Sequence, residues 1–148
     1  MQIPIDMPTI ILMVEQSRVQ IDSTLAAFRE IWFDVYVQNV DTVDQAIDYL
    51  FRKGRGTEEY PYPDLVILGA LTPVTDAIHL LSITRKSQKL QYLPVVAMTG
   101  LDKANHHSLA EKLGVALVMP KSQIATQARL ISEIMIDYWF ESAIPASK

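Results

Sequence analysis

The sequence predicts one α/β domain built on an open parallel sheet with helices on both faces. The first observation is a set of short apolar runs bounded by turn residues, as expected for strands buried on both faces. The second is that segments with apolar residues at helical spacing separate these runs. The third is that the connections are short, so that strands and helices alternate along the 148 residues.

The N-terminal part of the chain contains the first two expected strands. Thr9–Val14 is an unbroken apolar run and predicts a buried strand. From Arg18, apolar residues recur at helical spacing and predict the first helix. Asp34–Val40 alternates valine with polar residues, which is typical of an edge strand. Asp41 or Thr42 can cap the second helix that follows.

The third expected strand follows Arg52–Pro63, the most loop-like stretch of the chain, which is rich in glycine, proline and charge. Leu65–Leu68 is wholly apolar and predicts a strand buried on both faces. In α/β proteins, chemistry is placed just past the C-terminal end of such a strand. Here that position is Gly69, which has no side chain.

The same periodicities predict the remaining elements. In chain order these are a third helix at Thr75–Thr84, a fourth strand at Val95–Met98, a fourth helix at Ala104–Leu113, a fifth strand at Ala116–Met119 and a last helix at Ile124–Phe140. We expect a single domain over residues 1–148, with a core at about 9–140 and a short C-terminal tail at 141–148.

Composition argues against several classes of function. The chain has no cysteine, which excludes disulfides, thiol nucleophiles and thiolate metal sites. A net charge of −4 without a concentrated basic face argues against nucleic-acid binding. No apolar run approaches the ~20 residues of a membrane helix, and the start does not read as a signal peptide, so we expect a cytoplasmic protein without membrane contact. The adjacent His106 and His107 do not predict a metal site, because neighbouring helical residues point in different directions.

The order of elements and the residues at the strand ends resemble the CheY-like receiver domain of two-component response regulators. The resemblance covers about Thr9–Tyr138, and the long loop, the Arg85–Pro94 segment and the closing Tyr138 and Trp139 look most like small stand-alone phytochrome-associated regulators. It implies a flavodoxin-like (βα)5 three-layer sandwich with a five-stranded parallel sheet in the order 2-1-3-4-5. It also implies a site at the C-terminal strand ends.

Receivers transfer a phosphoryl group to an aspartate with the help of a divalent cation, a lysine and a hydroxyl. The resemblance matches Glu15, Thr99 and Lys121 to residues of that site. Gln16 stands where a metal-ligating aspartate is expected, and an amide is a poorer magnesium ligand than a carboxylate. Gly69 stands where the phosphoacceptor aspartate is expected, and glycine cannot be phosphorylated.

Two further positions depart from the family pattern. Pro120 precedes Lys121, whereas the family normally has a proline after the lysine. Val118 replaces the aromatic residue three positions before the lysine, which implies that the usual aromatic switch does not operate. No nearby carboxylate is expected to substitute, because Asp64 lies at the opposite end of its strand and Asp76 in the next helix.

We therefore expect a pseudo-receiver, a non-enzymatic signalling domain that binds another protein without phosphorylation and needs no cofactor or metal. The resemblance implies a histidine kinase, a phytochrome-like sensor or another signalling protein as the partner, and it also makes a homodimer plausible. The aromatic residues Tyr138, Trp139 and Phe140 at the end of the last helix are candidate interface residues.

Two alternatives remain open. Lys121 either forms an ion pair with Glu15 across the site, the commoner fate of a partly buried charge, or forms an anion pocket with Thr99. In the second case the chain is a small-molecule or anion sensor that also uses the Gly69 backbone. An enzyme with different chemistry on this fold would need a nucleophile and a base, and we can name neither.

Overall fold

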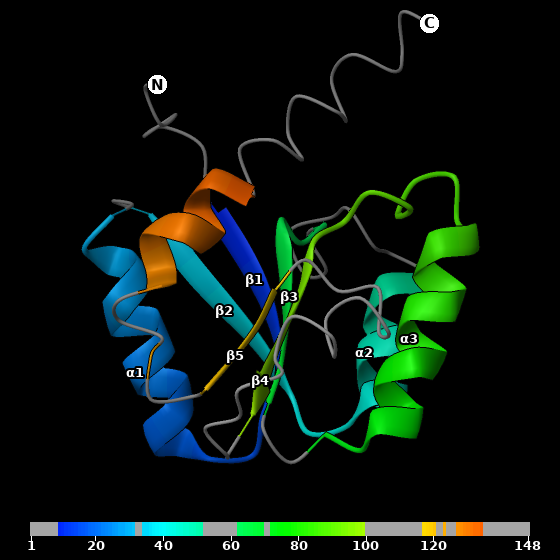
Figure 1. The fold of residues 1–148 in the computed structure, drawn as a ribbon, viewed down its shortest axis with the longest axis horizontal. Helices are drawn as coiled ribbons and strands as arrows, with labels where there is room; N and C mark the ends of the chain where they lie inside the picture. Colours follow the sequence, from blue (N-terminus) through cyan, green and yellow to red (C-terminus); the bar gives the residue numbers. More distant parts are fainter. Residues whose placement is uncertain are drawn as a thin grey trace, which may run out of the picture.

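The structure is a computed structural model, and it describes residues 9–31, 34–51, 62–69, 72–99, 117–120, 123 and 127–134. Strands and helices alternate from the first strand to the fourth, as predicted (Figure 1). The elements are β1 (Thr9–Val14), α1 (Arg18–Arg29), β2 (Val35–Val40), α2 (Val43–Phe51), β3 (Leu65–Leu68), α3 (Val74–Lys86), β4 (Val95–Thr99) and β5 (Leu117–Pro120). A further helical segment spans 127–134.

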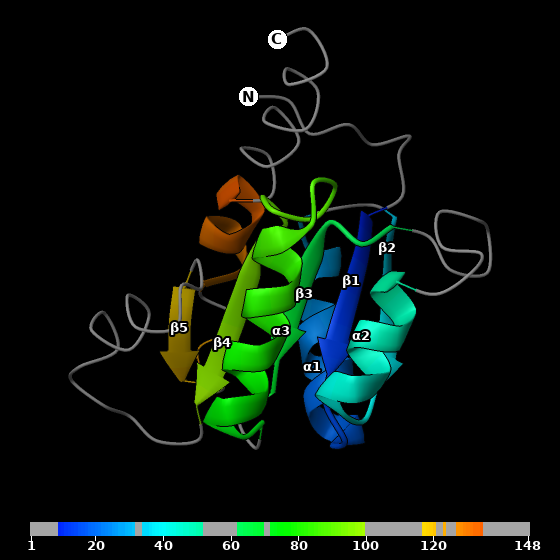
Figure 2. The same cartoon turned by 90° about the vertical axis from the view of Figure 1, so that its right-hand side faces the viewer.

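The strands form one five-stranded parallel sheet in the order β2-β1-β3-β4-β5, which confirms the expected topology. Figure 2 shows the strands side by side, with all arrowheads pointing toward the same edge of the sheet. β1 lies between β2 and β3, and Val14 at its end is opposite both Val40 and Leu68. The loops after the strands therefore meet at one edge, where α/β proteins place their sites.

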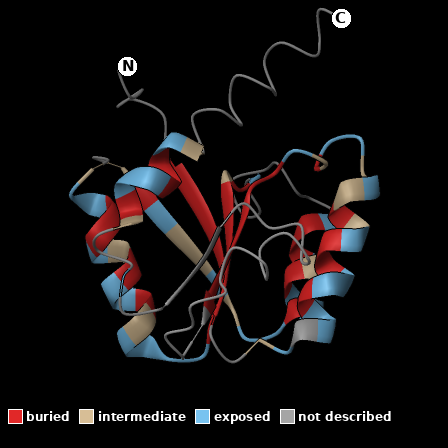
Figure 3. Cartoon of the chain, viewed as in Figure 1, coloured by how far each residue is buried: buried red, intermediate tan, exposed pale blue. Residues whose placement is uncertain are grey.

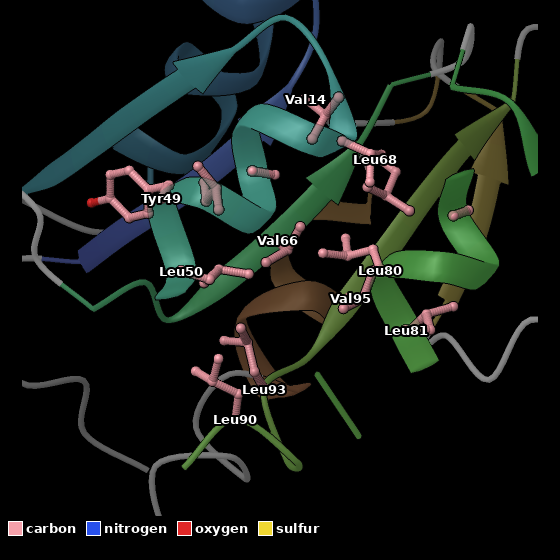
Figure 4. Close-up of a cluster of buried hydrophobic side chains, with 14 of the residues drawn as sticks. Val14, Tyr49, Leu50, Val66, Leu68, Leu80, Leu81, Leu90, Leu93 and Val95 are labelled. Carbon is pink, nitrogen blue, oxygen red and sulfur yellow. The ribbon is translucent and has the colours of Figure 1, made fainter. Parts of the chain in front are cut away.

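Helices cover both faces of the sheet, with α1 and the 127–134 segment on one side and α2 and α3 on the other (Figure 1). Ile11 and Met13 of β1 belong to a buried cluster with Phe28 of α1. Leu12 and Val14 belong to a second cluster on the α2 and α3 side (Figure 4). Alternate residues of β1 thus face opposite clusters, which explains why residues 10–14 are all apolar.

Two of the helices that start near the site, α1 and α2, are capped by nearby side chains. The Ser17 hydroxyl accepts a hydrogen bond from the Gln20 N–H of α1 at 3.3 Å. At α2, the Thr42 hydroxyl accepts from the Gln45 N–H at 3.2 Å. The Gln45 Oε1 in return accepts from the N–H groups of Asp41 at 2.7 Å and Thr42 at 3.3 Å. This reciprocal arrangement is a capping box, so Thr42 is the cap of the two candidates that the sequence offered.

Element boundaries differ from the predictions mainly at α3 and β5. α3 continues to Lys86, because the half-buried Arg85 is held by a hydrogen bond that its guanidinium donates to the Leu93 carbonyl at 2.9 Å. The same burial lowers the pKa of Arg85. β5 is displaced by one residue and ends at Pro120, opposite Thr99, because an edge strand tolerates a proline that lacks an N–H.

Several expected features lie partly or wholly outside the described residues. The predicted fourth helix at Ala104–Leu113 and the tail at 141–148 are among them, and only 127–134 of the predicted last helix is described. Within the described ranges, none of the helices has both the length and the apolar character needed to cross a membrane.

Thr9, at the start of β1, supplies a test of the core. Its side chain is 0% exposed, and its Oγ1 has no hydrogen-bond partner in the described part of the chain. A buried hydroxyl without a partner is destabilising, so Thr9→Val should raise the free energy of unfolding by about 1 kcal/mol, measured by urea denaturation.

The matched control is Thr24→Val in α1. Thr24 is also 0% exposed, but its hydroxyl donates to the Gln20 carbonyl at 2.8 Å. The same substitution should therefore leave stability unchanged or reduce it at this site. Equal effects of Thr9→Val and Thr24→Val would contradict the assignment of an unsatisfied hydroxyl to Thr9.

Candidate functional site

A pocket of about 310 Å³ lies at the C-terminal edge of the sheet, where β1, β2 and β3 end. Its walls come from the loops after these strands and from the first turns of α2 and α3. The lining residues are Val14, Glu15, Gln16, Asp41, Thr42, Val43, Gly69, Thr72, Pro73 and Asp76. The structure therefore brings together three of the predicted site residues, namely Glu15, Gln16 and Gly69.

Glu15 follows β1 and is held by its own loop. Its side chain is 9% exposed, and its Oε2 accepts hydrogen bonds from the N–H groups of Gln16 and Ser17, both at 3.0 Å. The Glu15 main chain is fixed as well, because its N–H donates to the Val40 carbonyl at 3.0 Å and its carbonyl accepts from Asn39 Nδ2 at 2.6 Å. The carboxylate thus has a defined position at the start of α1.

Gly69 lies directly against this carboxylate. Its N–H donates to the Val14 carbonyl at 2.8 Å, which continues the β1–β3 ladder by one residue. A Cβ at position 69 would lie 2.6 Å from the Val14 main-chain oxygen and 2.8 Å from Glu15 Oε1. Both distances are shorter than van der Waals contact, so position 69 has no room for a side chain in this arrangement.

Two aspartates that the sequence analysis did not assign to the site also line the pocket. Asp41 directly follows β2. Asp76 lies in the first turn of α3, the helix in which it was expected, and it also forms part of the pocket wall. Asp41 could have been identified, because the residue after each parallel strand meets the others at this edge. Both side chains are exposed, and among the described residues no group of three acidic or histidine side chains is arranged to hold a metal ion.

Asp64 lies outside the site, as predicted. It is at the opposite end of β3, where its Oδ2 accepts from the Ile10 N–H at 2.9 Å. The other predicted site residues are described only in part. Thr99 is the last residue of β4, and Val118 of β5 pairs with Ala97 of β4. The structure does not describe the side chains of Thr99 and Val118. Lys121 is also outside the described residues, so the Glu15–Lys121 ion pair stays a prediction. The candidate interface residues Tyr138, Trp139 and Phe140 likewise lie outside the described residues.

A five-stranded parallel sheet in the order 2-1-3-4-5, with a pocket at its C-terminal edge, defines a flavodoxin-like α/β protein. No protein-family model and no curated protein matches the chain, whereas many solved structures do. The bacteriophytochrome response regulator RtBRR is 26% identical, with a TM-score of 0.67 over 87% of this chain and 78% of its own.

Two more solved structures agree with that match. A two-component response regulator from Legionella pneumophila is 22% identical, with a TM-score of 0.69 over 87% of this chain and 98% of its own. The phosphorylated cyanobacterial phytochrome response regulator RcpA is 22% identical, with a TM-score of 0.65 over 88% and 95%. The chain therefore has the CheY-like receiver fold of response regulators, and phytochrome-associated regulators are among the similar structures, as predicted.

The close approach at Gly69 predicts the cost of any side chain there. Gly69→Ala should lower the free energy of unfolding by about 1–3 kcal/mol, because the new Cβ would overlap a main-chain oxygen that cannot move without distorting β1. Urea denaturation of the wild type and the variant measures this difference.

The Glu15→Ala background separates the two contacts. It removes the carboxylate that Cβ would meet but keeps the Val14 carbonyl, so the penalty of Gly69→Ala should shrink without vanishing. Strict additivity of the two substitutions would contradict direct packing of Glu15 on Gly69. A Gly69→Ala variant as stable as the wild type would contradict the close approach itself.

Proposed function

We propose that this chain is a pseudo-receiver, a regulatory domain that acts by binding another protein and does not depend on phosphorylation. The observation that supports this best is the packing at the end of β3, where Gly69 stands at the expected acceptor position and the Glu15 carboxylate covers it. A receiver needs a carboxylate nucleophile at this point. Gly69 supplies no side chain, and Glu15 is engaged by the N–H groups of its own loop.

The residues around Gly69 give further support. Gln16, at the expected position of a metal ligand, offers a neutral amide, which binds magnesium less well than a carboxylate. By contrast, the regulator RcpA is described as phosphorylated, and the receiver domain of the sensor kinase PA1611 from Pseudomonas aeruginosa has a magnesium ion in its active-site cleft. We infer that this chain has kept the receiver fold without that chemistry, and that it has no catalytic activity of its own.

A protein partner follows from this proposal. Receiver domains act in signal transduction through contacts with histidine kinases, and we propose a histidine kinase, a phytochrome-like sensor or another signalling protein as the partner. In ordinary receivers, phosphorylation biases a surface between two states. Without an acceptor, that surface must be set constitutively or by binding. A homodimer and an interface at residues 138–140 remain predictions from the sequence.

The described part of the pocket does not favour the alternative of an anion sensor. Its charged lining residues, Glu15, Asp41 and Asp76, are all acidic. The start of α2 is also a poorer anion site, because the Thr42 and Gln45 side chains already accept hydrogen bonds from the N–H groups of Asp41, Thr42 and Gln45. We therefore give the protein-binding function first place.

The test is to treat the protein with acetyl phosphate and magnesium, and separately with beryllofluoride and magnesium. We expect no covalent phosphorylation by intact-protein mass spectrometry and no rise in melting temperature. A ligand that bound the folded state at a hundred times its dissociation constant would add about 2.7 kcal/mol of stability, which a thermal scan resolves.

RcpA, treated in parallel, is the positive control, because it is a phosphorylated protein of the same fold. Phosphorylation of this chain, or a magnesium-dependent stabilisation by beryllofluoride, would overturn the proposal. Stabilisation by an anion without magnesium would instead support the sensor, and the anion would then be identified by titration.

A further inference from the structure

β2 forms one of the two edges of the sheet. It pairs with β1 alone among the described strands. All residues of β1 and β3 are buried, whereas β2 has one buried residue, Val35, and its Tyr36 side chain is 51% exposed (Figure 3). This strand therefore offers an edge with which no other described strand pairs.

The hydrogen bonds to β1 define which main-chain groups point outward from β2. The Asp34 carbonyl accepts a hydrogen bond from the Thr9 N–H of β1, and the Val40 carbonyl accepts one from the Glu15 N–H just after β1. The main-chain groups of the even-numbered residues therefore point toward β1. In a strand, successive residues direct their main-chain groups to opposite sides. The N–H and C=O groups of Val35, Val37 and Asn39 are therefore directed away from β1, along the free edge.

The sequence of β2 lacks the features that normally protect an edge strand. Natural edges are shielded by charged residues, proline or bulges. β2 reads VYVQNV, with three β-branched residues, no charge and no proline, and it pairs with β1 over its whole length without a bulge. A six-residue edge of this kind is suited to pairing with another extended strand.

Charge selects the kind of strand that fits. Residues 34–51, which span β2 and α2, contain four aspartates and neither lysine nor arginine, so they carry −4, equal to the net charge of the whole chain. Asp34 and Asp41 stand at the two ends of β2. A second copy of this chain would bring the same aspartates to the contact, and like charges across such a pair are unfavourable.

Tyr36 presents an exposed ring near one of these charges. Asp34 raises the pKa of Tyr36 as a hydrogen-bond partner and as a nearby negative charge, and Arg29 acts in the opposite direction. The ring is 51% exposed and can pack against an incoming aliphatic or basic side chain.

We propose that β2 is a docking edge on which an extended segment of a partner protein, uncharged in its centre and basic at its ends, adds as a further strand. The inference goes beyond the function proposed above by naming a surface and the chemistry of its partner. It depends on the proposed function in one respect, namely that the chain acts by contacting other proteins.

The test uses a blocked, fluorescent peptide of alternating threonine and valine with paired lysines at both ends. Fluorescence anisotropy should show saturable binding to the wild-type protein that weakens with salt. Hydrogen exchange should show new protection at the amides of Val35, Val37 and Asn39. The same peptide with paired glutamates at its ends should bind at least about tenfold more weakly.

Val37→Pro removes one outward N–H without removing a hydrogen bond to β1. It should weaken peptide binding by about fivefold or more, the effect of one main-chain hydrogen bond. Val37→Ala loses the same side chain but keeps the N–H, and it should bind within about twofold of the wild type. If Val37→Pro does not fold by circular dichroism, the wild type with a peptide N-methylated at alternate residues replaces it.

Equal binding of the lysine and glutamate peptides, absence of binding, or tight binding of the N-methylated peptide would overturn the proposal. Concentration-dependent dimerisation through β2 would also overturn it. In sedimentation this would appear as a wild-type dimer that is lost in the Val37→Pro variant or when the lysine peptide is added to the wild type. These outcomes are independent of the phosphodonor test. Phosphorylation of the chain would refute the pseudo-receiver function and leave the docking edge standing, and failure of the peptide would do the reverse.

Discussion

The pairing of β1 with β3 is the constraint on which the site depends. In their register Val14 lies opposite Leu68, so the Val14 carbonyl and the Glu15 carboxylate come to lie against Gly69. The Gly69 N–H extends the ladder to Val14, and the carboxylate fills the space beside it. The site is therefore determined by main-chain geometry, with Glu15 held by the N–H groups of Gln16 and Ser17 just before α1.

Much of the fold could be predicted because burial on both sides leaves a strong pattern. Leu65–Leu68 is apolar at every position and Thr9–Val14 at every position after Thr9, and both are strands. The strand order came from the resemblance to receivers, since no local pattern encodes which strands are neighbours. The end of α3 differs from the prediction because the polar, basic stretch after Thr84 favoured a loop, whereas Arg85 belongs to the helix and donates a hydrogen bond to the Leu93 carbonyl.

The candidate site was less accessible from the sequence. Position 69 was identified from its place after a buried strand, but the lack of space for a side chain there depends on distances that no spacing rule contains. Asp41 and Asp76 reach the pocket because α2 and α3 begin at the same edge as β1 ends. The sequence pattern places each aspartate within its own helix or loop, but it does not show that α2 and α3 begin at the same edge of the sheet.

The narrow space above Gly69 also bears on how such a domain can change over evolutionary time. An aspartate introduced at position 69 in the present background would be destabilising, since its Cβ would meet both the Val14 main-chain oxygen and the Glu15 carboxylate. Any side chain at position 69 would therefore need a compensating change at Glu15 and a shift of the β1 main chain at Val14. Residue 69 can in this sense vary only together with its neighbours on another strand.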